Sequence, residues 1–158
     1  MTTAYAASFV AGDKSYLSIA DAAQTGLDFS GSWTISGWIY PSSGVVCSLF
    51  NKYATTLNQR SYRAWVNAGG NISGNVSPDG VANTAFTASG GQVTPGAWHF
   101  FAVGYDHART KITTQVDGNP VQEFDFTGPM YNASSDFLLG YTLNNSTYCN
   151  GSLAGVSA

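Results

Sequence analysis

The sequence has 158 residues, of which 44% are hydrophobic, 14% aromatic and only 9% charged, against roughly 25% charged in an average globular protein. A chain of this length buries about 68–70% of the surface that its unfolded form exposes, so residues 1–158 can form one domain with its own core. Six Lys and Arg against nine Asp and Glu give a net charge of −3, which excludes nucleic acid as the expected partner, and no apolar run reaches the roughly 18 residues of a membrane span.

Short aromatic and β-branched segments recur along the chain, whereas no window of a dozen residues shows helical periodicity. Only the segment 17–27 leaves room for a short helical turn. Asp117-Gly118 predicts a hairpin with a type I′ turn. The predicted strands cover residues 15–19, 33–40, 45–51, 61–67, 71–77, 83–87, 98–106, 111–116, 121–127 and 137–140, with a last strand from residue 151.

The segment 98–106 is apolar on both of its alternating faces, which predicts a central strand covered on both sides. We also expect at least three of the four tryptophans, Trp33, Trp38, Trp65 and Trp98, in the core. Without helical crossovers, the economical architecture is all-β: a two-sheet antiparallel jelly-roll sandwich of about ten to twelve strands.

The residues do not support an enzyme. Glu123 is the only glutamate, and Glu123 with Asp125 on one strand face is typical of a solvated edge rather than of a glycosidase carboxylate pair. No Gly-x-Ser-x-Gly elbow accompanies His99 or His107. We therefore expect no catalytic residues.

Cys47 and Cys149 are a single distant pair without the spacing of a zinc site. Two alternatives remain open for them: one disulfide, or two buried thiols that act as small hydrophobes.

Several segments carry a family resemblance, among them residues 15–19 with 24–29, and 58–62. Residues 33–41 (Trp-Thr-Ile-Ser-Gly-Trp-Ile-Tyr-Pro), 98–106 (Trp-His-Phe-Phe-Ala-Val-Gly-Tyr-Asp) and 115–121 (Gln-Val-Asp-Gly-Asn-Pro-Val) are similar to the FTISAWVKP, WHHVAVTYD and YVDGKLV strands of laminin-G-like, concanavalin A-like jelly-roll domains. This group includes the pentraxins. Residues 137–140 and 150–153 follow in the same order, so the resemblance spans nearly the whole chain.

The resemblance also indicates where a calcium ion would bind, and the chain departs from it there. Many relatives hold calcium with the aspartate of an early FDG segment and an acidic IDE segment in the last strand. Ala11 and Ala154 stand at the equivalent positions, and alanine offers no side-chain oxygen to a hard cation. We expect no metal and no cofactor, although Asp13 is close enough in sequence to take a ligand position.

The chain starts with a methionine and shows no export signal, whereas domains of this group are usually exported. This combination favours a non-catalytic phage virion component, a capsid decoration or fibre and adhesion module located on the virion, whose partner is itself or a capsid or tail protein. The alternative is a secreted, lectin-like carbohydrate-binding module on an extracellular surface, whose export signal was removed during cloning.

A glycan would be held by aromatic faces and by side chains that satisfy its hydroxyls. Loops at one rim of a rigid sandwich are the usual place for such residues. The candidates for glycan binding are Tyr131, Tyr141, Asn144, Asn145 and Tyr148. The alternative role of these residues is to cap loops at the sandwich edge.

Overall fold

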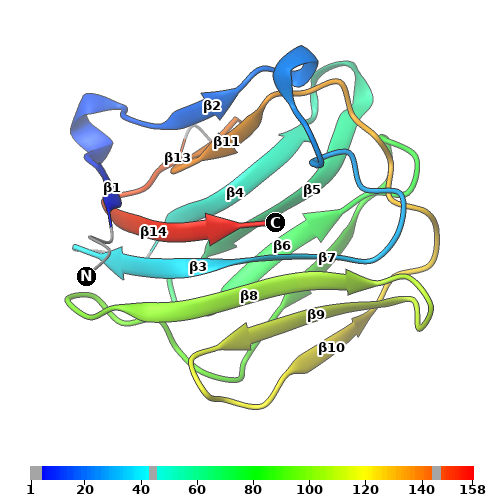
Figure 1. The fold of residues 1–158 in the computed structure, drawn as a ribbon. Coiled ribbons are helices and arrows are strands. Elements are labelled where there is room, and N and C mark those ends of the chain that lie inside the picture. Colours follow the sequence, from blue (N-terminus) through cyan, green and yellow to red (C-terminus); the bar gives the residue numbers. More distant parts are fainter. Residues whose placement is uncertain (1–4, 43–45, 144–146) are drawn as a thin grey trace.

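The computed structural model describes residues 5–42, 46–143 and 147–158, which form two six-stranded antiparallel sheets and a small hairpin (Figure 1). Sheet A has the order β1 (Ala6–Phe9), β14 (Gly151–Ser157), β3 (Trp33–Pro41), β8 (His99–Asp106), β9 (Lys111–Val116), β10 (Gln122–Asp125). Sheet B has the order β2 (Leu17–Ile19), β11 (Phe137–Leu139), β4 (Cys47–Ala54), β5 (Gln59–Val66), β6 (Ile72–Val76), β7 (Thr84–Thr87). The hairpin pairs β12 (Tyr141–Thr142) with β13 (Thr147–Tyr148). This confirms the all-β sandwich.

Every predicted strand is present, and among the described residues the ends shift by at most three residues. Val45, the predicted start of β4, lies outside the described residues. The predicted helical turn is the 3-10 turn η2 (Asp21–Ala23), and η1 (Ala11–Asp13) and η3 (Thr56–Asn58) are two more such turns. None of the helices in the described ranges is long and apolar enough to cross a membrane. The sequence missed β1, β12 and β13, because these strands are too short to show a period of two and exist through pairing with distant segments.

The Asp117-Gly118 turn joins β9 to β10 as predicted, but its type I′ geometry was wrong. Asp117 has a φ of 51°, whereas Gly118 is not among the residues with positive φ, and a type I′ turn needs positive φ at both positions. The side chain of Asp117 accepts a hydrogen bond from the backbone N–H of Phe100 in β8 at 2.9 Å. This tertiary contact favours a turn geometry other than type I′.

The core lies between the sheets and is rich in aromatic rings. In β3, the inward positions Trp33, Ile35 and Ile39 are buried and alternate with outward positions. The Trp33 ring stacks on Phe29 at 5.1 Å and tilts against Tyr62 at 5.1 Å. This alternation fixes the register of β3, since a one-residue slip would turn the rings to the solvent.

The expectation that at least three tryptophans lie in the core was wrong. Trp33 is buried and Trp65 is half-buried, but Trp38 is 47% exposed and Trp98 is 45% exposed. Both exposed rings lie on the outer face of sheet A, at positions that alternate with core residues of β3 or precede β8 directly. The strand β8 is central in its sheet, as predicted, but no described part of the chain covers its outer face.

Cys47 and Cys149 form a disulfide across 102 residues of sequence. Cys47 begins β4, and Cys149 lies between β13 and β14. The cross-link therefore ties the chain next to the β12–β13 hairpin to sheet B, and both cysteines are buried.

Candidate functional site

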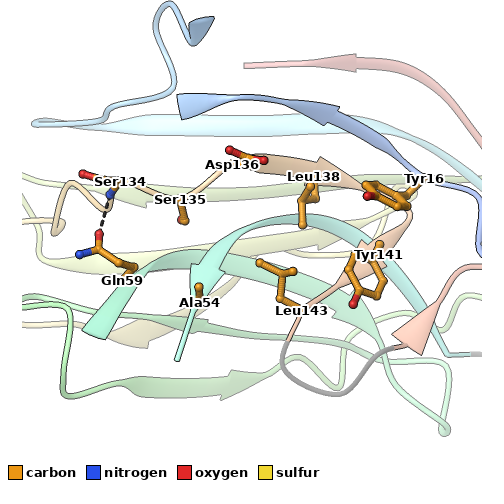
Figure 2. A pocket seen from close by; sticks show the side chains of 9 residues that line it. All are labelled: Tyr16, Ala54, Gln59, Ser134, Ser135, Asp136, Leu138, Tyr141 and Leu143. Atoms are coloured by element: carbon orange, nitrogen blue, oxygen red, sulfur yellow. Dashed lines mark hydrogen bonds between the residues drawn. The ribbon is translucent and has the colours of Figure 1, made fainter. Parts of the chain in front are cut away.

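A pocket of about 270 Å³ opens on the outer face of sheet B, where β11 lies beside β4 (Figure 2). Leu138 lies in it, because this residue alternates with Phe137 and Leu139, which pack on the core. The lining residues come from four separate parts of the sequence: Tyr16, Ala54, Gln59, Ser134, Ser135, Asp136, Leu138, Tyr141 and Leu143. We call this site the tyrosine pocket.

Its aromatic wall consists of Tyr16 and Tyr141, with ring centroids 5.2 Å apart. Tyr148 lies opposite Tyr141 in the β12–β13 pair and stacks on it at 4.4 Å with an angle of 20°. The Ser48 hydroxyl donates to the Tyr141 carbonyl at 3.0 Å and anchors β12 on β4. Loss of hydration, together with the hydrogen bond and charge of Tyr141 and the charge of Tyr16, raises the pKa of Tyr148. The Tyr148 phenol therefore stays neutral at physiological pH and can both donate and accept hydrogen bonds.

The other end of the pocket is polar. The Gln59 side-chain oxygen accepts a hydrogen bond from the Ser134 backbone N–H at 2.6 Å (Figure 2). The Asp136 carboxylate is exposed and accepts from the Asp21 N–H at 3.3 Å. Ser135 is 7% exposed, and its buried hydroxyl has no hydrogen-bond partner among the described residues. A buried hydroxyl without a partner is costly, and a ligand group that reached this oxygen would relieve that cost.

A buried lysine holds this end of the pocket in place. Lys52 is fully buried, and its Nζ lies 2.8 Å from Asp21 and 3.1 Å from Asp28. The same ammonium donates to the Gln24 side-chain oxygen at 2.6 Å and to the Ser135 carbonyl at 3.2 Å. Lys52 thus joins β4, the η2 segment and the pocket wall.

The charges around the pocket are mostly negative. None of the nine lining residues is Lys, Arg or His. Lys52 is already paired with Asp21 and Asp28, and Asp136 adds a further carboxylate. An anionic ligand would meet repulsion here.

The predicted glycan-binding residues fall in different places. Tyr141 lines the pocket, and Tyr148 stacks on the Tyr141 ring but is not a lining residue. Tyr131 is not a lining residue; its backbone N–H donates to the Ser77 carbonyl, and its ring packs against the Gly80 turn. Asn144 and Asn145 lie outside the described residues.

Sequence reasoning missed most of the lining residues, including Tyr16, Gln59 and Asp136. Tyr16 is 125 positions before Tyr141, and the pairing of Ile19 with Phe137 between β2 and β11 brings the two regions together. No spacing in the sequence reports such a contact. A tyrosine near the start of the short predicted strand 15–19 was the only signal that the sequence offered.

One hydrogen-bonded chain resembles a catalytic triad. His99 Nε2 lies 3.0 Å from the Thr94 hydroxyl, and His99 Nδ1 lies 2.9 Å from Asp117. The Thr94 backbone N–H also donates to Nε2 at 3.1 Å, which occupies the single lone pair that a neutral imidazole offers. This network therefore favours a structural role, in which His99 joins the 94–98 segment to the β9–β10 turn.

Glu123 and Asp125 lie exposed on the edge strand β10, where they pair with Arg109 and Lys111. This agrees with the solvated edge that the sequence predicts. Across the described ranges, no three His, Cys, Asp or Glu side chains gather in the way a metal site requires. Ala11 lies in η1 and Ala154 in β14, and the absence of a calcium ion stays a prediction.

The fold resembles several solved structures of low sequence identity. The carbohydrate-binding module CBM40 of the Ruminococcus gnavus IT-sialidase, bound to α2,3 sialyllactose, is 14% identical, with a TM-score of 0.66 over 98% of this chain and 86% of that chain. Mouse laminin α1 domains LG4-5 are 16% identical, with a TM-score of 0.69 over 100% of this chain and 44% of that chain. A heptameric SAP-like pentraxin from Limulus polyphemus is 11% identical, with a TM-score of 0.56 over 85% of this chain and 71% of that chain.

A search of curated protein sequences found no match. A laminin G family model, described as the concanavalin A-like lectin/glucanases superfamily, matches residues 11–158. This match and the solved structures confirm the resemblance to laminin G-like domains and pentraxins. The chain belongs to the concanavalin A-like lectin/glucanases superfamily.

Proposed function

We propose that the protein is a non-catalytic carbohydrate-binding module and that the tyrosine pocket holds one uncharged sugar unit. One observation carries the proposal: the pocket combines the rings of Tyr16 and Tyr141 with a buried Ser135 hydroxyl that has no partner among the described residues. Aromatic rings stack on the apolar face of a pyranose, and polar side chains satisfy its hydroxyls. A volume of about 270 Å³ lies just below the range of pockets for drug-sized ligands, so it suits a single ring.

The charge of the site supports a neutral ligand. The CBM40 neighbour is bound to sialyllactose, whose terminal sugar carries a carboxylate. The tyrosine pocket has no cationic side chain among its lining residues and presents the Asp136 carboxylate instead. A ligand carboxylate and the Asp136 carboxylate would repel each other in the pocket, where both are less hydrated.

The disulfide supports a location in an oxidising compartment or outside the cell, since such bonds are rare in reducing cytosol. The more specific expectation of a virion component remains a prediction. Neither the family description nor the three neighbours above mention a virion. A capsid or tail partner is likewise untested.

The experiment compares lactose with α2,3-sialyllactose, because the two sugars differ only in the acidic unit. Isothermal titration should show binding of lactose, or of another neutral sugar such as glucose or N-acetylglucosamine, and weaker binding of the sialylated form. Tyr141→Ala should lower the affinity for the neutral sugar about tenfold, a factor typical of one lost ring contact. Tyr131→Ala is the matched control, because this tyrosine does not line the pocket.

Two results would contradict the proposal. Equal binding to the native protein and to Tyr141→Ala would place the ligand elsewhere. Preference for sialyllactose that Asp136→Asn leaves unchanged would refute the charge argument. Circular dichroism of each variant separates lost binding from lost folding.

A further inference from the structure

The outer face of sheet A carries aromatic side chains that no described part of the chain covers. Trp38 and Phe100 lie opposite each other on β3 and β8, with ring centroids 5.6 Å apart. Tyr40 and Trp98 form a second pair at 5.5 Å. Figure 1 shows β14, β3 and β8 side by side in this layer. We call these four residues the aromatic face.

This face is open and free of charge at its centre. A shallow hollow of about 430 Å³ lies over it, lined by Tyr5, Ala6, Trp38, Trp98 and Ala154. The two alanines pair across β1 and β14 and leave room beside the rings. The Lys111–Asp125 pair lies at the opposite edge of sheet A, on β9 and β10.

The exposure of the aromatic face to solvent needs an explanation, because the sequence pattern predicts a covered strand. Residues 98–106 are apolar on both faces, which is typical of a strand covered on both sides, yet Trp98 remains 45% exposed. Exposed aromatic patches of this kind mark binding sites in soluble proteins. The face therefore points to a ligand that covers Trp38 and Trp98.

We propose that the aromatic face is a second binding surface, which stacks against the chain of a neutral polysaccharide and lies apart from the tyrosine pocket. The area favours a glycan over a protein partner. Two half-exposed tryptophans offer on the order of 200 Å², whereas a stable protein interface needs about 800 Å² per partner. Two or three sugar rings match the smaller area.

The surroundings also fit a polysaccharide. Ser8 and Ser152 pair across β1 and β14, and Ser152 lies opposite Tyr40. Short hydroxyl side chains beside the rings can bond to sugar hydroxyls without blocking access. None of the five described residues that line the hollow is charged, so they give it no electrostatic preference for acidic polymers.

The test measures retention of the protein on three insoluble neutral polysaccharides: microcrystalline cellulose, chitin and granular starch. We expect retention on at least one of them. The double variant Trp38→Ala/Trp98→Ala should lower the partition constant at least about tenfold, and Trp38→Phe/Trp98→Phe should restore most of it. Lys111→Ala is the matched control on the charged edge of the same sheet.

Tyr141→Ala separates this inference from the proposed function. We expect Tyr141→Ala to lose binding of the soluble sugar and to keep binding of the polysaccharide. We expect the double tryptophan variant to show the reverse. No retention on any of the three polymers, or retention that the double alanine variant leaves unchanged, would overturn the inference. Light scattering would also overturn it if the native protein formed oligomers that the tryptophan substitutions dissociate. The aromatic face would then be a contact between copies of the chain.

Discussion

Replacing Lys52 with methionine tests whether its ion pairs hold the sandwich together. Methionine keeps the apolar stem but removes the ammonium that contacts Asp21, Asp28, Gln24 and Ser135. Removing one partner of a buried ion pair costs about 3–5 kcal/mol of unfolding free energy. The two carboxylates are 37% and 43% exposed and regain water, so we expect the low end, about 3 kcal/mol.

The assay is urea unfolding followed by tryptophan fluorescence, to which the buried Trp33 contributes. With a slope of about 2 kcal/mol per molar urea, the midpoint should fall by roughly 1.5 M. Lys111→Met is the matched control, since Lys111 pairs with the 87% exposed Asp125 and should cost less than about 1 kcal/mol. In the Lys52→Met background, Asp21→Asn should recover part of the lost unfolding free energy, because it removes a carboxylate that has lost its ammonium partner. Equal costs for Lys52→Met and Lys111→Met would refute the reasoning.

Three further predictions concern stability. Reduction of the Cys47–Cys149 disulfide, which closes a loop of about a hundred residues, should lower the unfolding free energy by about 2–4 kcal/mol; an unchanged urea midpoint with reductant would contradict this. Desolvation opposes ionisation of Asp117, but hydrogen bonds from His99 and the Phe100 N–H, with the charge of His99, hold the pKa of Asp117 below its usual value. The ionised Asp117 carboxylate therefore stabilises the folded state fully above about pH 4, and this stabilisation is lost as the pH falls further. In thermal melts between about pH 5 and 2, the Asp117→Asn variant should lose less stability on acidification than the native protein. Gly74→Ala places a Cβ 2.5 Å from the Arg63 carbonyl oxygen and should cost about 1–3 kcal/mol, whereas Gly12→Ala, with no atom within 4 Å, should be near neutral in the same unfolding assay.

The sequence predicted the fold because the evidence for it is local. Alternation in residues 33–40 and the turn at Asp117-Gly118 each lie within one short segment, and a period of two and a turn need no knowledge of distant residues. The order of the strand motifs then indicated the superfamily, which the family match confirms. Strand ends shifted where pairing with a neighbour, rather than propensity, decides them.

Only the tertiary structure decided the candidate sites. Tyr16 meets Tyr141, and Lys52 meets Asp21 and Asp28, through pairings between strands that are distant in sequence. The sequence identified Trp98 as apolar but not whether anything covers it, because the pattern of a strand covered on both sides is the same with or without the covering layer. Which of two apolar faces stays open depends on how the whole chain packs, and the local period carries no information about that.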